Sequence, residues 1–204
     1  MKKSKIWARY LFLSVSAVIL LALAGCGGLD SGVKSVPALK GVFMDGPVGG
    51  LTYATPTLKG VTKADGVFEY QAGEKVTFSI GTVVLGSTVG KPVVTPLDFF
   101  ADAKGAADQR VVNICVVLQT LDQDGNAENG IVITEKVSSM VSQYGKDIDF
   151  NKHVRAFSFD GGFRAVMAEL NNIDAFGDMP RAVKPPVTAQ KHFEASLAKL
   201  AEKK

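Results

Sequence analysis

The sequence is poor in the residue types that most often carry catalysis or bind transition metals. It contains only two cysteines, Cys26 and Cys115, and two histidines, His153 and His192. Neither histidine has a cysteine or a second histidine at the spacing of a zinc site, which argues against a zinc centre. His192 falls in a predicted helix, where we expect it at the surface or at the boundary of the core.

Catalytic motifs are also missing. The sequence has no Gly-x-Ser-x-Gly elbow, no Gly-x-x-x-x-Gly-Lys phosphate loop and no dinucleotide fingerprint. A Ser-His-Asp triad stays open because its members need not be neighbours in sequence. The serines, however, lie in ordinary contexts, such as Ser138, Ser139 and Ser196 on helical patterns. We therefore expect a protein that is not an enzyme.

The N-terminus has the pattern of a secretory leader. Four basic residues lie among the first nine positions, and the run Tyr10–Ala24 that follows has no charge. At about 15 residues, this run is shorter than the roughly 18 that a membrane-spanning helix needs. It ends in Leu23-Ala24-Gly25-Cys26, which resembles the lipobox of bacterial lipoproteins. The resemblance implies a signal peptide at 1–25, cleavage before Cys26 and lipid, with fatty acids such as palmitate, on its thiol.

Cleavage would change the charge balance of the protein. Removing four of the 23 basic residues leaves 19, against 20 acidic ones, so the mature net charge would be −1. No strongly basic surface would remain, and we expect no nucleic-acid partner. Gly27 stands where an aspartate would signal retention in the inner membrane, so the outer membrane is favoured.

Lipidation of Cys26 would leave Cys115 as a lone thiol. It stands in the apolar stretch 111–118, where we expect a small core residue rather than a reactive group. No disulfide would then be available, and the fold must be stabilised by its core. About 165 ordered residues are enough to bury one.

The mature chain is predicted to have an α+β fold. Residues 26–38 are rich in glycine and serine and indicate a flexible tether. Residues 39–95 alternate short β-rich runs with turns; in one of them Val76, Phe78 and Ile80 alternate with polar neighbours. This pattern favours a small antiparallel β-sandwich.

Residues 96–204 are predicted to be mainly helical and packed on the sandwich. Apolar residues recur there at helical spacing in four stripes. The stripes are Val111, Ile114, Cys115 and Leu118; Val137, Met140, Val141 and Tyr144; Phe163, Val166, Met167 and Leu170; and Phe193, Leu197 and Leu200. Asp160 is expected to cap the third helix and Thr188 the fourth. We expect these stripes to form core, with a ligand groove as the alternative.

Part of the first region resembles a known family. Residues 41–51 and 62–70 resemble carboxypeptidase-regulatory-like domains, which are transthyretin-like β-sandwiches, over roughly residues 40–90. Short segments over more of the mature chain are also similar to uncharacterised proteobacterial envelope lipoproteins and to the N-terminal modules of larger envelope proteins. These segments include Asp45–Val48, Ala72–Val76, Thr95–Asp98, Leu118–Asp122 and Asp124–Asn126. In some of those proteins a catalytic or adhesive domain follows; because this sequence ends at Lys204, we expect none here. The likeness implies a fold and a location but no reaction.

One polar stretch suggests an ion site. Asp122, Asp124 and Asn126 occupy alternate positions, so a loop could direct three oxygens at a calcium ion. The stretch is not an EF-hand, because Ala127 stands at the glycine position and Ile133 at the position of the final glutamate. The alternative is a turn that joins a buried helix to a strand at 131–133.

Two classes of function follow from the sequence. The first is a membrane-anchored envelope module that binds a protein or a glycan without catalysis. The second is a small hydrolase or a carrier of an apolar ligand, with a pocket between the sheet and the helices. A continuous apolar cavity would favour the second class.

Overall fold

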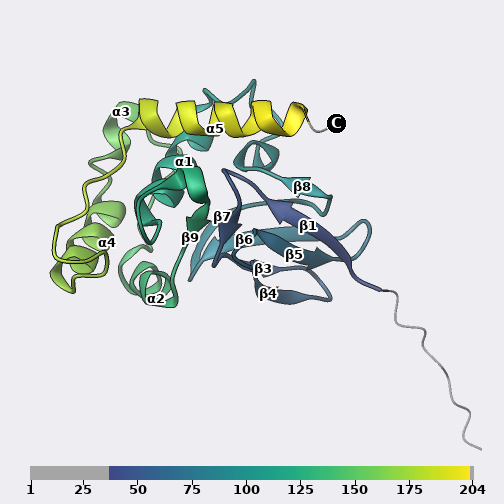
Figure 1. Cartoon of the computed structure of the whole chain (residues 1–204), viewed down its shortest axis with the longest axis horizontal. Coiled ribbons are helices and arrows are strands. Elements are labelled where there is room, and N and C mark those ends of the chain that lie inside the picture. The colour runs from purple at the N-terminus through teal and green to yellow at the C-terminus, as the bar shows by residue number, and fades with distance from the viewer. Residues whose placement is uncertain (1–36, 203–204) are drawn as a thin grey trace, which may run out of the picture. The chain divides into compact units, whose positions relative to one another are not determined.

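Three sets of strands and a group of helices make up residues 37–202, the part of the chain that the structure, a computed structural model, describes. The predicted leader, Cys26 and most of the predicted tether lie outside the described residues. Figure 1 shows the strands at one end, with α2, α3 and α4 at the other end and α5 laid across both. The expected α+β fold with a β-sandwich-like region is confirmed.

The strands are short. Their bounds are β1 Leu39–Phe43, β2 Val48–Gly49, β3 Thr52–Ala54, β4 Lys59–Val61, β5 Val67–Tyr70, β6 Lys75–Ile80, β7 Val83–Val89, β8 Val93–Val94 and β9 Ile131–Val132. One sheet has the order β4-β3-β6-β7, the second β5-β1-β8, and β2 pairs with β9. As the period-two pattern predicts, alternate side chains of β6 are buried.

Most strand pairs are antiparallel, but two short pairs are parallel. β1 runs parallel to β8, with Phe43 opposite Val94, and β2 runs parallel to β9, with Val48 opposite Ile131. A parallel pair needs a long crossover between its strands. The β2–β9 pair therefore joins the start of the sandwich to the region that follows α1.

The helices lie in the second region, as predicted. Their bounds are α1 Gln109–Leu121, α2 Glu135–Tyr144, α3 Val154–Phe157, α4 Gly161–Asn172 and α5 Pro186–Ala201, with 3-10 turns η1 Pro96–Phe99 and η2 Ala127–Asn129. The Asp160 carboxylate accepts a hydrogen bond from the Phe163 backbone N–H at 2.9 Å, so the predicted cap of α4 is confirmed. The prediction that Thr188 caps the last helix is wrong, because α5 begins two residues earlier. Pro186 is its first residue, a position that tolerates proline because the N–H there has no helical partner.

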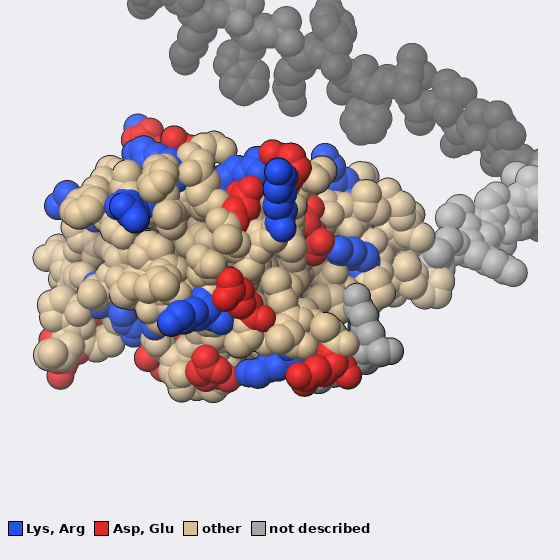
Figure 2. Space-filling model, turned by 90° about the horizontal axis from the view of Figure 1, so that it is seen from above, with Lys and Arg blue, Asp and Glu red and all other residues tan. Residues whose placement is uncertain are grey.

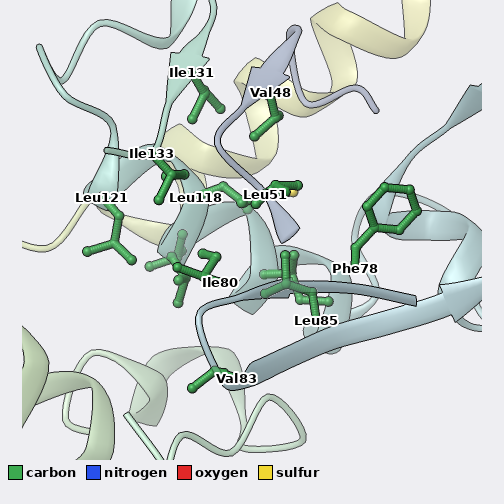
Figure 3. Close-up of a cluster of buried hydrophobic side chains, with 14 of the residues drawn as sticks. Val48, Leu51, Phe78, Ile80, Val83, Leu85, Leu118, Leu121, Ile131 and Ile133 are labelled. Carbon is green, nitrogen blue, oxygen red and sulfur yellow. The ribbon is translucent and has the colours of Figure 1, made fainter. Parts of the chain in front are cut away.

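The core is formed by the inner faces of the sheets, by α1 and by the apolar faces of α2, α4 and α5. Phe43, Phe68 and Phe78 are buried at its centre, with ring centroids 4.8 Å apart for Phe43 and Phe78 and 5.0 Å for Phe68 and Phe78. A second, aliphatic part of the core lies where β2, β6, β7, β9 and α1 meet (Figure 3). The predicted core role of Cys115 is confirmed, because its side chain is fully buried in α1.

No helix among residues 37–202 is both long enough and apolar enough to cross a bilayer.

Gly50, between β2 and β3, provides a test of how the two regions meet. Its φ is +86°, and a Cβ there would overlap the carbonyl oxygen of Ile133 just after β9. We expect Gly50→Ala to lower the free energy of unfolding by about 3 kcal/mol or more, because strain and a backbone clash add. Urea denaturation measures this loss.

Gly73 is the matched control. Its φ is +81°, but a Cβ there would meet only open space. Gly73→Ala should therefore cost only the left-handed strain, about 1–2 kcal/mol. Equal losses in the two variants would contradict the close approach of Gly50 to Ile133.

Candidate functional site

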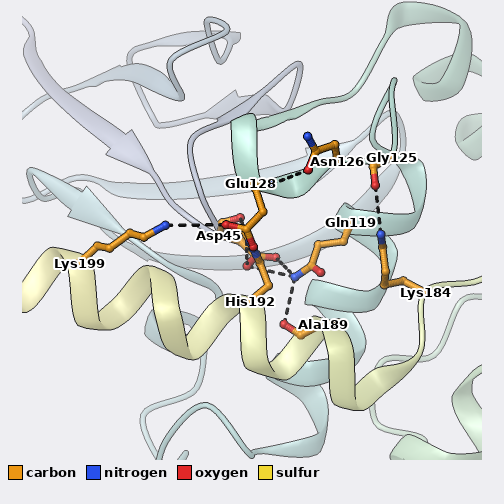
Figure 4. A network of polar contacts seen from close by, with 9 residues as sticks. All are labelled: Asp45, Gln119, Gly125, Asn126, Glu128, Lys184, Ala189, His192 and Lys199. Atoms are coloured by element: carbon orange, nitrogen blue, oxygen red, sulfur yellow. Dashed lines mark hydrogen bonds and ion pairs between the residues drawn. The ribbon is translucent and has the colours of Figure 1, made fainter.

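A polar network lies beneath α5 and joins four segments that are distant in sequence. Asp45 comes from the β1–β2 turn, Gln119 from α1, Glu128 from η2 and His192 from α5. Figure 4 shows their side chains converging in the space between α5 and the turn after β1. These are the described polar groups that most resemble a site, and their individual contacts decide what they can do.

Asp45 is the fully buried centre of the network. The Gln119 side-chain amide donates to both of its carboxylate oxygens, at 3.0 and 3.3 Å, and to the Ala189 carbonyl at 3.1 Å. The Cys115 thiol also lies within hydrogen-bonding reach of this carboxyl group. Burial raises the pKa of Asp45 to about 7, although the bond from Gln119 and the charge of His192 act in the opposite direction. Desolvation therefore outweighs the favourable hydrogen bonds.

His192 is held through both of its ring nitrogens. Nε2 lies 3.0 Å from the backbone carbonyl oxygen of Asp45, and Nδ1 lies 3.1 Å from a carboxylate oxygen of Glu128. A carbonyl and a carboxylate can only accept, so both bonds form together only when each nitrogen carries a proton. The Asp45 carboxylate is also near, at 3.8 Å from Nε2. The hydrogen bond from His192 lowers the pKa of Glu128. The His192 ring thus fastens α5 to the turn after β1 and to η2.

Cys115, His192 and Asp45 are the residue types of a cysteine-dependent catalytic triad, but their geometry differs from one. The thiol faces Asp45 rather than the imidazole, and both ring nitrogens of His192 are occupied. Burial, followed by the charge of Asp45, raises the pKa of Cys115 well above its ordinary value. A nucleophilic cysteine needs a lowered pKa and access to substrate. The arrangement therefore holds elements together and does not activate a nucleophile.

A small hollow beside His192 does not supply a serine triad either. It has a volume of about 170 Å³, and Glu128, Ser196 and Lys199 provide its polar lining. Ser196 follows His192 by one turn of α5, but both nitrogens of the ring already face other groups. Ser196 therefore has no ring nitrogen to which it could transfer its proton.

The predicted calcium loop connects the buried helix α1 to the strand β9. Asp122 is buried, and its Oδ1 accepts from the Val132 backbone N–H at 2.8 Å. The carboxyl groups of Asp122 and Asp124 lie within hydrogen-bonding reach of each other. Asn126 does not join them: its Oδ1 faces the Glu128 backbone N–H at 3.4 Å, at the start of η2. The structure thus brings together two of the three predicted ligands.

A shallow hollow of about 290 Å³ opens over this loop, and its lining includes Asp122, Asp124 and Asn129. The Asn129 side-chain amide donates to Asp124 Oδ2 at 2.8 Å. In the described residues no three His, Cys, Asp or Glu side chains gather at a metal-binding distance. An ion here would therefore need amide, main-chain or water oxygens as well, and calcium stays a prediction.

The remaining histidine has a local structural role. His153 is exposed, and its Nδ1 accepts from the Arg155 backbone N–H at 3.3 Å at the start of α3. It therefore acts as a helix cap and takes no part in the network beneath α5.

The network could not be found by local sequence patterns. Gln119 lies 74 positions from Asp45, and His192 lies 147 positions from it. His192 was expected at the surface or at the boundary of the core. Its side chain is 9% exposed, so it lies at the boundary. The only sequence signal was a histidine on a helix that also carried an apolar stripe.

Comparison with known proteins returns no match: no family model, no curated protein and no solved structure matches the chain.

The raised pKa of Asp45 predicts a pH dependence of stability. Between its ordinary value of 3.8 and about 7, the folded protein binds a proton that the unfolded chain does not. The free energy of unfolding should therefore fall as pH rises through this range. Between pH 5 and pH 8 we expect a loss of about 3 kcal/mol from this group, since each pKa unit corresponds to about 1.4 kcal/mol.

Asp45→Asn is the comparison that isolates this effect in urea titrations at several pH values. The variant has no titrating group at position 45, so its stability should fall less between pH 5 and pH 8 than that of the wild type. Carboxyl groups whose pKa is lowered, such as Glu128 and Asp108, lose stabilisation only at more acidic pH. An equal fall in the free energy of unfolding of the two proteins between pH 5 and pH 8 would contradict the raised pKa of Asp45.

Proposed function

We propose that this protein is a lipid-anchored module of the cell envelope, attached through Cys26 to the outer membrane. It acts by binding an envelope protein or a glycan rather than by catalysing a reaction. The anchor is supported by the leader and the lipobox-like Leu23-Ala24-Gly25-Cys26. Stable attachment needs more than one acyl chain, because a single chain binds a bilayer only marginally.

The anchor would keep the folded body close to the membrane. Residues 27–38, twelve in number, separate Cys26 from the first residue of β1. Twelve residues span at most about 40 Å when fully extended. Partners of the body would therefore be components of the same envelope surface or of the layer directly beside it.

The two hydrogen bonds that engage both ring nitrogens of His192 are the observation that favours binding over catalysis. His192 is the described histidine that contacts the buried Asp45, and both of its ring nitrogens already fasten α5 to neighbouring segments. Cys115, whose thiol lies within reach of Asp45, is fully buried. Residues that could have served a hydrolase are thus committed to holding the fold together.

The surface agrees with a protein or glycan partner rather than a nucleic acid. Figure 2 shows basic and acidic side chains interspersed over one face, with uncharged surface between them. Binding to a phosphate backbone needs clustered lysine and arginine. Together with the mature net charge of −1, this mixed pattern supports a partner that is not a nucleic acid.

A second candidate function is carriage of an apolar ligand, and one observation favours it. A hollow of about 430 Å³ lies between η1 and the last turns of α5, with Leu97, Leu197 and Leu200 in its lining. Its rim carries an ion pair between Lys91 and Asp98 at 2.6 Å. Its volume falls within the range of small-molecule sites. Saturable binding of a fluorescent fatty acid that Leu197→Asp abolishes would favour this function.

Two substitutions separate anchoring from thiol chemistry. Cys26→Ser should remove the acyl mass from the mature protein and deplete the protein from the outer-membrane fraction. Cys115→Ser keeps the size of the buried side chain and a hydrogen-bonding group toward Asp45. It should leave the location unchanged, and it should leave unchanged the complexes that the protein forms on chemical crosslinking in intact cells.

Mass spectrometry of the native protein and of its crosslinked species provides the measurement. The anchor proposal fails if the wild type carries an unprocessed leader or an unmodified Cys26. The binding proposal fails if folded Cys115→Ser protein loses its crosslinked complexes, because those complexes would then depend on the thiol.

A further inference from the structure

One buried carboxylate oxygen in the α1–β9 loop has no described hydrogen-bond partner. Asp122 follows the last residue of α1, and only 1% of its surface is exposed. Its Oδ1 is bonded to the Val132 N–H, but Oδ2 is buried without a hydrogen-bond donor among the described residues. An unsatisfied buried polar atom in a folded protein calls for a missing partner, such as an ion or water.

The surroundings of this oxygen suit a cation. The carboxyl groups of Asp122 and Asp124 lie within reach of each other, and two ionised carboxylates have no proton to share. The hollow above them is also lined by Asn129, whose amide nitrogen is bonded to Asp124. The amide oxygen of Asn129 remains available as a third ligand.

We propose that this hollow binds one hard divalent cation, best matched by calcium. The protein ligands are Asp122 Oδ2, a carboxylate oxygen of Asp124 and the amide oxygen of Asn129, and water completes the shell. Calcium accepts six to eight oxygens in irregular geometry, whereas magnesium requires near-ideal octahedral geometry and gives up its water reluctantly. This ligand set differs from the sequence-based one, because Asn129 takes the place of Asn126.

Nearby basic groups limit the affinity. Arg181 donates to the carbonyl oxygens of Asp122 at 2.7 Å and Gln123 at 3.3 Å, and its charge also acts on Asp124. Lys184 Nζ also donates to the Gly125 carbonyl oxygen of the same loop, at 3.1 Å. Two carboxylates against one guanidinium and one ammonium leave no net local charge, which is weak for a divalent ion. We therefore expect a dissociation constant on the order of 10⁻⁴–10⁻³ M, as in extracellular calcium modules.

The ion would strengthen a junction of the fold. Asp122 links the end of α1 to β9 through Val132, and β9 pairs with β2. A ligand that binds only the folded state stabilises it in proportion to its concentration over its dissociation constant. Calcium should therefore raise the melting temperature of the protein, whatever its partner in the envelope.

The test uses the full-length lipidated protein in detergent, stripped with EDTA and held at a fixed neutral pH. Calcium binding is measured by equilibrium dialysis, and thermal melting is followed with calcium and, separately, with magnesium. We expect about one calcium per chain, a melting temperature that rises by a few degrees at about 10 mM calcium and returns with EDTA, and a smaller effect of magnesium.

Variants identify the ligands. Asp122→Asn and Asp124→Asn should each weaken calcium binding at least tenfold, and Asn129→Ala should weaken it clearly. Asn126→Ala should change it less than about twofold, since that oxygen faces the Glu128 N–H. Asp147→Asn, an exposed residue outside the loop, removes the same charge and should leave binding unchanged. Asp124→Asn and Asn129→Ala keep the test valid if Asp122→Asn does not fold.

Two results would overturn the proposal. The first is no calcium retained by the wild-type protein and an unchanged melting curve at about 10 mM calcium. The second is binding that Asp147→Asn weakens as much as Asp124→Asn does, which would mean that the ion responds to overall charge. A wild-type protein that binds no calcium could also be stabilised by Asp122→Asn. In that case a proton shared between the carboxyl groups of Asp122 and Asp124 takes the place of the ion.

Discussion

The burial of α1 from Val111 to its last residue, Leu121, is the constraint on which the rest of the structure depends. Every residue from Val111 to Leu121 is buried, and Asn113, Gln119 and Thr120 among them are polar. Valine-rich helices have modest intrinsic stability, so packing must hold this one in place. Buried polar groups must in turn find partners. The Asn113 amide donates to two carbonyls of the loop before α3, Gln119 donates to Asp45 and to α5, and the Thr120 hydroxyl accepts from the Lys184 N–H. The polar side chains of one helix therefore fix the segments that surround it.

Both candidate sites arise from this helix. Gln119 of this helix donates to the Asp45 carboxylate and so holds Asp45 beneath α5. His192 then contacts the backbone carbonyl oxygen of Asp45 in the same turn. Asp122 at its C-terminal end places a carboxylate against β9, while Arg181 supplies positive charge to the carbonyls there. Positive charge at the C-terminal end of a helix is favourable because of the helix dipole. The first site binds elements of the fold to one another, and the second leaves an oxygen available for an ion.

Sequence patterns predicted the parts of this structure that depend on neighbouring residues. Helical spacing identified α1, α2, α4 and α5, and alternation identified β6, because burial on one face imposes those periods. The contact of His192 with Asp45 has no such signature, since tertiary packing alone brings the two residues together. Asn126 was expected as an ion ligand because alternate residues can face one ion. The loop instead turns into η2 at that point, which directs the oxygen of Asn126 to the Glu128 N–H and brings Asn129 to Asp124.

The proposed location also gives a physical reason for the burial of Cys115. Extracytoplasmic compartments are oxidising, and an exposed lone thiol there would form disulfides with other molecules. Only the thiolate reacts readily, and burial together with the charge of Asp45 raises the pKa of Cys115 well above its ordinary value. The thiol therefore remains protonated and inaccessible while α5 stays in place. The His192 ring holds α5 against the turn after β1, so the same contacts that fasten this helix also protect the one described cysteine of the body.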